Sequence, residues 1–444
     1  MFNGLTKVTQ QLSPGMRKAI HNVGWLSAER VLSMLLTLAV GIQVVRYLGP
    51  ENYGKFSYGV SLAGLFGAVA KLGLDSIVVR NIVRDENSTA EVLGTACLLK
   101  LIAGFITIAL VSCTTWTLNT EPQVRWIAII VASGLVFQSF EVIDFWFQSR
   151  VLSKPVAGIR SIVIIFSSTI KLLFITLKLP LIAFAWLMIV DVLFNASGII
   201  WVYFKHNQSL LVWKVSWSRA KDLLKDSYPL ILSAVMVTIY MKIDQVMLGN
   251  MSTNEAVGNY AAAVRFSEVW YFLPIAIYSS VFPAIVRAKQ KSEKEYYLRL
   301  QQLYDLMAGM SLIVATCVTL LSSTLITNLL GQEYTSAGTI LALHVWTGPF
   351  LILGVARGKW LIVENLTQLN FLTNLIGAIS NVLLNLFLIP AYDAIGAALA
   401  TVLSQVLLMF ICLLYPGLFL NSWMLIKALF IPFRFSLYIQ KKQF

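Results

Sequence analysis

The sequence predicts an all-α polytopic membrane protein of about 12 transmembrane helices, arranged as two six-helix lobes with both termini in the cytoplasm. Hydrophobic residues make up 58% of the 444 residues and charged residues only 12%, and the mean hydropathy is +0.76. A soluble domain carries about a quarter charged residues and does not repeat apolar runs of roughly 18 residues along its length. Besides the composition and the long apolar runs, an internal repeat that relates the two halves of the chain supports this prediction.

Each expected span is a continuous apolar run of about 20 residues, the length at which a helix crosses roughly 30 Å of hydrocarbon. A barrel strand would instead alternate polar and apolar residues over about ten residues. In the N-terminal lobe, residues 1–204, the expected spans are 23–46, 57–80, 92–115, 125–148, 156–177 and 180–204. In the C-terminal lobe, residues 228–420, they are 228–249, 257–286, 301–324, 336–357, 366–389 and 393–416.

Two further segments are polar, basic and aromatic. Residues 205–227 contain Trp213 and Trp217 and read as a cytoplasmic linker between the lobes, at the membrane interface. Residues 421–444 combine aromatic and basic side chains, which favours a tail that lies along the inner leaflet as an interfacial helix.

Lys and Arg residues gather at the amino end and in every second connection between the spans, and this sets the predicted orientation. By the positive-inside rule, these connections and both termini are cytoplasmic. The net charge of +13 is therefore a topology signal and does not indicate nucleic-acid binding. The basic groups are Lys7, Arg17 and Lys18; Arg80 and Arg84; Arg150 and Lys154; Lys205 to Lys225 in the linker; Arg287 to Arg299; and Arg357 with Lys359.

No residue pattern predicts a metal or catalytic site. Four cysteines lie within or at the ends of apolar spans without metal-ligand spacing, and we interpret them as small packing residues. The three histidines are scattered, and neither a phosphate-binding loop nor a nucleophile elbow is present. A transporter that carries out no covalent chemistry is therefore the predicted class.

A short motif recurs at the first outer turn of each half. Residues 48–56 read LGPENYGKF and residues 248–260 read LGNMSTNEAVGNY. The pattern Glu-x-x-Gly-x-aromatic follows the shared Leu-Gly in both copies, and we interpret its acidic and glycine positions as turn and capping residues. Two halves of six spans in the same orientation predict a parallel repeat, a V-shaped cavity between the lobes and transport by alternating access. The positions concerned are Glu51 and Gly54, and Glu255 and Gly258.

Three longer stretches resemble a known family. They are VVRYLGPENYGKFSYGVSLAG at 44–64, DQVMLGNMSTNEAVGNYAAAVRFSEVWYFLP at 244–274 and IPAYDAIGAALATVLS at 389–404. They resemble the polysaccharide-export branch of the multidrug/oligosaccharidyl-lipid/polysaccharide (MOP) exporter superfamily, and within it the Wzx-type O-antigen flippases. In the late motif of that family a glycine commonly follows the tyrosine, whereas this chain has Asp393. We expect that departure to alter only an outer turn.

The resemblance implies a lipid-linked oligosaccharide flippase of the bacterial inner membrane. Its ligand would be an undecaprenyl-diphosphate-linked O-antigen or polysaccharide repeat unit, moved from the cytoplasmic to the periplasmic leaflet. Such a head group cannot cross hydrocarbon unaided, because buried polar and charged groups cost several kcal/mol each. The resemblance further implies no cofactor, coupling to a proton or sodium gradient, contact with membrane lipids, and a polysaccharide polymerase and a chain-length regulator as partners.

Charges inside the spans are the candidate functional residues, because each costs about 2.5–3.5 kcal/mol to insert and such residues usually face a bundle interior or an aqueous cavity. A cationic cavity for the diphosphate or sugar is predicted from Arg30, Lys71, Lys242 and Arg265. Ion-coupling or salt-bridge roles are predicted for Glu29, Asp75, Asp244 and Glu268. The structural alternative for these groups is mutual neutralisation, since Lys71 and Asp75, and Arg265 and Glu268, are spaced for pairing on one helix face.

The spacing of the remaining charges gives two further expectations. Lys242 and Asp244 are about 200° apart around a helix and so cannot share one face. Lys100, Lys171, Asp191 and Asp305 are predicted to form packing pairs.

Two other functions fit parts of the pattern. A drug or cation antiporter of the same superfamily would share the architecture but would need net acidic groups in its cavity. A membrane glycosyltransferase or polymerase acting on lipid-linked sugars should show a long outer loop with a catalytic motif, whereas the outer connections here are short.

Overall fold

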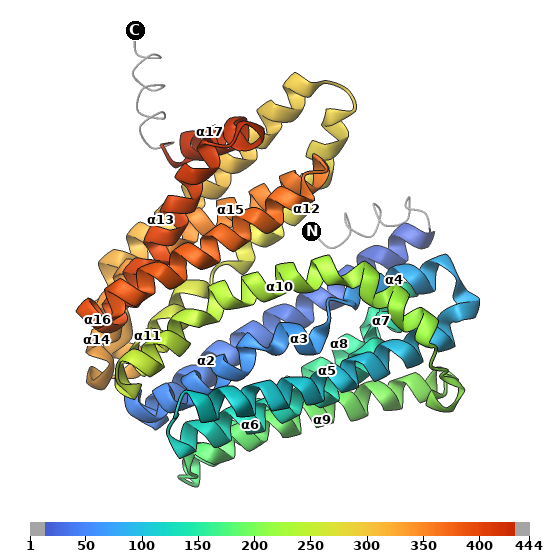
Figure 1. Ribbon diagram of the computed structural model, residues 1–444, viewed down its shortest axis with the longest axis horizontal. Helices are drawn as coiled ribbons and strands as arrows, with labels where there is room; N and C mark the ends of the chain where they lie inside the picture. The colour runs from blue at the N-terminus through green and yellow to red at the C-terminus, as the bar shows by residue number, and fades with distance from the viewer. Residues whose placement is uncertain (1–13, 431–444) are drawn as a thin grey trace, which may run out of the picture. The chain divides into compact units, whose positions relative to one another are not determined.

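The computed structural model describes residues 14–430, and these residues form α-helices and short 3-10 turns without any strand (Figure 1). Nine helices in this part of the chain are long and apolar enough to cross a membrane, or ten if the bent pair Gln332–His344 and Thr347–Val363 is one span. The predicted all-α, multi-pass class is confirmed. The helices of the described residues form two compact units: the first comprises residues 14–47 with Gly59–Val235, and the second comprises Leu48–Tyr58 with residues 236–430.

The first unit contains the expected N-terminal spans, and the second of these is broken. Helix α2 (Pro14–Leu65) runs through span 23–46, bends at Gly49 and ends inside span 57–80. The rest of that span is divided between α3 (Gly67–Lys71) and α4 (Asp75–Arg84). The following helices are α5 (Thr89–Thr117), α6 (Pro122–Phe137), α7 (Val142–Ser149), α8 (Ser153–Thr176) and α9 (Leu181–Lys205).

The residues of the expected linker pack onto this first unit. Helix α9 ends at Lys205, and α10 (Trp217–Met251) already begins within the linker. The backbone N–H of Lys214 donates to the carbonyl oxygen of Ala90 at 3.1 Å. Arg80 on α4 forms an ion pair with Asp226 on α10. The start of α10 is thus fixed against α4 and α5 by backbone and side-chain contacts.

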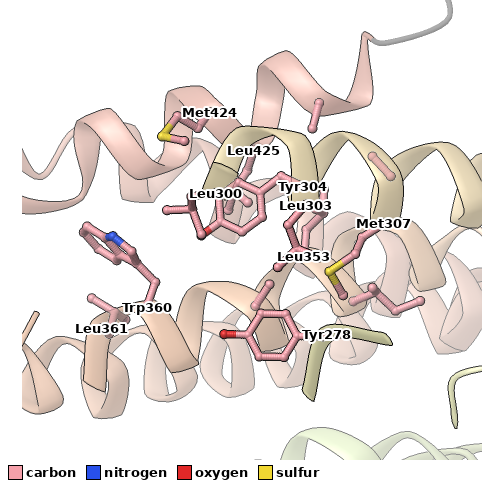
Figure 2. Close-up of a cluster of buried hydrophobic side chains, with 14 of the residues drawn as sticks. Tyr278, Leu300, Leu303, Tyr304, Met307, Leu353, Trp360, Leu361, Met424 and Leu425 are labelled. Carbon is pink, nitrogen blue, oxygen red and sulfur yellow. The ribbon is translucent and has the colours of Figure 1, made fainter. Parts of the chain in front are cut away.

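The second unit continues through α10 and has a core of aromatic and aliphatic side chains (Figure 2). Its further helices are α11 (Asn254–Glu268), α12 (Phe272–Lys289), α13 (Glu293–Leu330), α14 (Thr335–His344), α15 (Thr347–Val363), α16 (Thr367–Leu413) and α17 (Pro416–Leu429). Tyr278, Tyr304 and Trp360 meet there from α12, α13 and α15. Met424 and Leu425 of α17 pack into the same core, so the described part of the expected tail covers this lobe, whereas residues 431–444 lie outside the described residues.

The two copies of the repeated motif touch each other through their glycines. A Cβ on Gly54 would lie 1.7 Å from the carbonyl oxygen of Asn254, and one on Gly258 would lie 1.9 Å from that of Pro50. Both glycines lie inside helices, so their interpretation as turn and capping residues was wrong. Their missing side chains let the backbones of α2 and α11 come into contact. The N-terminus of α11 is capped by Thr253, whose hydroxyl oxygen accepts from the N–H of Ala256.

The bend that separates the last two expected spans lies at Asp393. Spans 366–389 and 393–416 are the two arms of α16, and at the junction Asp393 has φ 49° and ψ −130°. Glycine adopts such angles far more readily than residues with a Cβ. The Asp393 carboxylate compensates in part, because it accepts a hydrogen bond from the hydroxyl of Ser252 at 2.7 Å. The departure from the family motif therefore places a non-glycine residue at the helix junction itself.

We expect Gly258→Ala to lower the free energy of unfolding by about 1–3 kcal/mol, because the added methyl group overlaps the Pro50 carbonyl and must push two helices apart. Thermal unfolding in detergent, followed by size-exclusion chromatography, measures the change. Gly158→Ala on α8 is the matched control: nothing lies within 4 Å of a Cβ there, and the helix should gain about 0.5–1 kcal/mol. Equal changes in thermal stability for Gly258→Ala and Gly158→Ala would disprove the close contact between the two helices.

We expect Asp393→Gly to raise the melting temperature, because it relieves backbone strain of about 1–3 kcal/mol and loses only one exposed hydrogen bond. Asp393→Ala keeps the strained backbone and removes the same hydrogen bond, so its melting temperature should fall below that of the original protein. Comparison of the two melting temperatures separates the effect of backbone strain from the effect of the lost hydrogen bond. Identical melting temperatures for Gly and Ala would show that the junction is unstrained.

Candidate functional site

The interior of the second unit contains one carboxylate held only by neutral groups. Asp244 on α10 is 4% exposed. Its Oδ1 accepts from Asn385 Nδ2 at 2.5 Å, and its Oδ2 accepts from the hydroxyls of Thr401 at 2.7 Å and Tyr260 at 2.8 Å. None of the ion pairs found within residues 14–430 involves Asp244. The site is therefore a negative charge surrounded by hydroxyl and carboxamide groups.

The bends described above bring these groups together. Tyr260 belongs to the repeated motif on α11, which begins after the short turn that ends α10. Asn385 and Thr401 lie on opposite arms of α16, on either side of Asp393. A straight helix would separate them by about 24 Å, at 1.5 Å per residue. The kink folds the two arms back so that both contact Asp244.

A small cavity of about 20 Å³ adjoins the carboxylate, and Tyr240, Glu268 and His344 contribute to its wall. That volume holds about one water molecule or one small ion. The Oδ1 atom of Asn385 is buried, and within the described chain it has no hydrogen-bond partner. A carboxylate with hydroxyl and carboxamide oxygens is the donor set that hard cations prefer. The residues present thus fit a cation such as sodium, and a proton on Asp244 is the other way to neutralise the site.

The other predicted acidic residues lie in different surroundings. Glu268, the last residue of α11, lines the same small cavity and interacts electrostatically with Lys242 and Asp244. Glu29 is half-buried on α2. Asp75 is exposed at the start of α4, where it interacts electrostatically with Lys100, Glu141 and Lys71. Only Asp244 and Glu268 are brought together at one site.

The four predicted cationic residues are divided between the units. Arg30 and Lys71, both exposed, belong to the first unit, and Lys242 and Arg265, both half-buried, belong to the second. In the described chain, no ion pair within 4 Å joins Lys71 to Asp75, so their helical spacing does not produce a direct pair. Asp244 is buried and Lys242, two residues before it on α10, is half-buried.

Several other charged residues within the expected spans form contacts between neighbouring helices. Lys100 is 1% exposed and bonds to Glu141 at 3.1 Å, which confirms its predicted packing role. Asp144 bonds to Arg160 at 2.8 Å. Asp191 accepts a hydrogen bond from Ser167 at 2.6 Å and interacts electrostatically with Lys171. These groups lie mainly in the first unit, each with a partner on a neighbouring helix.

Sequence reasoning missed two parts of the second unit. The neutral members of the Asp244 site carry no charge and so were not considered, although Asn381 and Asn385 stand out as amides four residues apart in an apolar run. Arg357 was counted as a loop charge, and that interpretation was wrong. The structure places it within α15, 6% exposed, with its Nη1 atom 3.2 Å from the Sγ of Cys412. It lines a second cavity, of about 390 Å³.

Two protein families match long segments of the chain. The family described as "Polysaccharide biosynthesis protein" matches residues 19–289, more than half of the chain. The MatE family matches residues 229–387. The two matches overlap over residues 229–289, which include Asp244 and Tyr260.

Individual relatives agree with the family match. The chain is 22% identical over 397 residues to the capsular polysaccharide biosynthesis protein CapF of Staphylococcus aureus, which covers 87% of this chain and 96% of CapF. It is 30% identical over 173 residues to the probable flippase AglR of Haloferax volcanii, where the match covers 38% of this chain and 36% of AglR.

Two solved structures show the same fold at low identity. An inward-facing multidrug resistance MATE family transporter of the MOP superfamily has a TM-score of 0.67 at 14% identity, over 92% of this chain and 98% of that one. The lipid II flippase MurJ, in an inward closed conformation, has a TM-score of 0.68 at 15% identity, over 93% and 92%. Family and fold support a transporter rather than an enzyme. The chain belongs to the polysaccharide biosynthesis protein family.

Proposed function

We propose that this protein is a flippase for lipid-linked glycans, and that its substrate is an undecaprenyl-diphosphate-linked O-antigen or polysaccharide repeat unit. It moves this unit from the cytoplasmic to the periplasmic leaflet of a bacterial inner membrane by alternating access. The observation that carries the proposal is the polysaccharide biosynthesis match over residues 19–289 in a chain built of membrane-length helices. The names of the relatives CapF and AglR and of the structural neighbour MurJ point the same way.

We further propose that a cation gradient drives transport through Asp244. A carboxylate buried away from any ion pair is costly unless a cation or proton neutralises it. The hydroxyls of Tyr260 on α11 and Thr401 on α16 and the carboxamide nitrogen of Asn385 on α16 converge on it, beside a cavity of about 20 Å³, which is enough for one ion. Sodium suits this arrangement better than a proton does, because the hydroxyl and amide oxygens can serve as ligands.

A drug or cation antiporter is the second candidate, and the MatE match over residues 229–387 favours it. Such a protein would bind small organic cations and would not affect lipid-linked sugars. Deletion of the gene distinguishes the two candidates, since only loss of a flippase leaves lipid-linked repeat units in the cytoplasmic leaflet.

We expect a deletion strain to lose surface polysaccharide and to accumulate lipid-linked repeat units accessible only from the cytoplasmic side. The original gene should restore the polymer, whereas Arg30→Ala and Arg265→Ala should not, because each removes a cation predicted to contact the diphosphate or sugar. Protein levels in the membrane are measured in parallel and should stay unchanged. Arg84→Ala, which changes an exposed arginine at the end of α4, is the control and should restore the polymer. Polymer in both cavity variants would disprove the cationic-cavity hypothesis.

We expect sodium to raise the melting temperature of the purified protein and Asp244→Asn to abolish that increase. Ligand binding to the folded state alone stabilises it by an amount that grows with the logarithm of ligand concentration. Asn keeps the shape of the side chain and removes its charge. Asp305→Asn is the control, because Asp305 is bonded to Gln301 outside the site. An undiminished sodium response in Asp244→Asn would show that the ion binds elsewhere.

A further inference from the structure

Helix α15 contacts both the core of the second unit and a cavity. Leu353, Trp360 and Leu361 lie at i, i+7 and i+8 and pack into the core of the second unit (Figure 2). Gly354 and Gly358 of the same helix border the cavity of about 390 Å³. This volume is within the range of about 300–1,000 Å³ that is typical of small-molecule sites. The core contacts fix the helix, and the glycines leave the space beside it open.

Arg357 places a positive charge at this cavity, and it has no negative partner within residues 14–430. The residue is 6% exposed, and its only hydrogen bond found within the described chain is to the Cys412 sulfur, a weak acceptor. No ion pair among residues 14–430 includes it. The described residues that line the cavity include no Asp or Glu. Burying an uncompensated guanidinium costs several kcal/mol, so the cavity is poised for an anion that supplies the missing charge.

The rest of the cavity wall is suited to an amphipathic ligand. Asn370, Asn374 and Gln405 offer carboxamide groups from both arms of α16. Met236 of α10 and Leu408 of α16 contribute apolar surface. An arginine fork binds phosphate oxygens in a two-point geometry, and amides bind hydroxyl groups. The combination matches a phosphate or diphosphate with a sugar on one side and hydrocarbon on the other.

We propose that the Arg357 cavity binds the diphosphate end of a prenyl-diphosphate lipid, with Arg357 on the phosphate oxygens and the start of the prenyl chain against the apolar wall. This inference rests on the proposed function and assigns it a binding site within the second unit alone. The cavity is too small for a whole glycolipid, so the remaining sugars and the long chain extend outside it. In the predicted orientation, Arg357 lies toward the cytoplasmic side, where substrate loads.

Binding of farnesyl diphosphate to the purified full-length protein, measured by native mass spectrometry and by titration, tests this site. We expect Arg357→Gln to weaken the affinity at least 10-fold and Arg357→Lys to recover only part of it. Lys359→Gln, which removes an exposed charge two residues away on the same helix, should leave the affinity unchanged. Equal affinity in Arg357→Gln and the original protein would overturn the assignment.

A second variant tests the cavity without touching the charge. A Cβ on Gly354 would have no atom within 4 Å, so Gly354→Leu should fold while its side chain fills the cavity and reduces farnesyl diphosphate binding at least 10-fold. Gly158→Leu, at an equally open helical position, is its control. Unchanged binding in Gly354→Leu would place the ligand elsewhere.

A competition experiment distinguishes a prenyl diphosphate from a membrane phospholipid as the ligand of the cavity. Phosphatidylglycerol, added at the same concentration, should displace farnesyl diphosphate poorly, and its own binding should not depend on Arg357. Loss of phosphatidylglycerol binding in Arg357→Gln, with farnesyl diphosphate binding intact, would make the cavity a phospholipid site and overturn the proposal. A deletion strain that accumulates no lipid-linked sugar would disprove the flippase function, whereas the binding measurement would still decide the chemistry of the cavity.

Discussion

The structure depends on one constraint: a charge or polar group at bilayer depth needs a partner, because the hydrocarbon offers none. Several charges in the described helices meet it with an opposite charge. Lys100 bonds to Glu141, and Asp144 bonds to Arg160, each pair joining neighbouring helices. Such pairs fix the position of one helix against the next. They leave little affinity for a ligand, since their charges are already neutralised.

Asp244 and Arg357 depart from this pattern, which is why both carry functional proposals. Each is buried in the second unit, and each is surrounded by neutral groups in place of an opposite charge. The two cavities are adjacent, because Tyr240 lines both and its hydroxyl accepts a hydrogen bond from Gln405. A cation bound in one cavity and an anion bound in the other would therefore both lie against Tyr240, which lines the two cavities. This provides a physical route by which an ion gradient can alter the binding of a diphosphate within one lobe.

The repeated motif shows how a correct sequence pattern can be given the wrong structural role. The two Glu-x-x-Gly-x-aromatic copies suggested turns, since glycine is common in turns. In the structure they form a helix contact in which Gly54 and Gly258 leave room for the backbone of the other copy. The same motif supplies Tyr260 to the Asp244 site. Its packing role and its functional role are thus adjacent on α11, and neither could be seen without the partner helix.

Hydropathy and charge pattern by themselves determined the all-α membrane class and the approximate span positions, and they made Asp244 a candidate site residue. An apolar run of helical length and a charge within it have few other physical explanations. The tertiary structure decided which neutral residues complete that site, because Asn385 and Thr401 meet only after α16 bends at Asp393. It also decided that Arg357 is a buried cavity residue. A charge near the end of an apolar run looks the same in sequence whether it reaches water or faces the protein interior, and only the packing of α15 distinguishes the two.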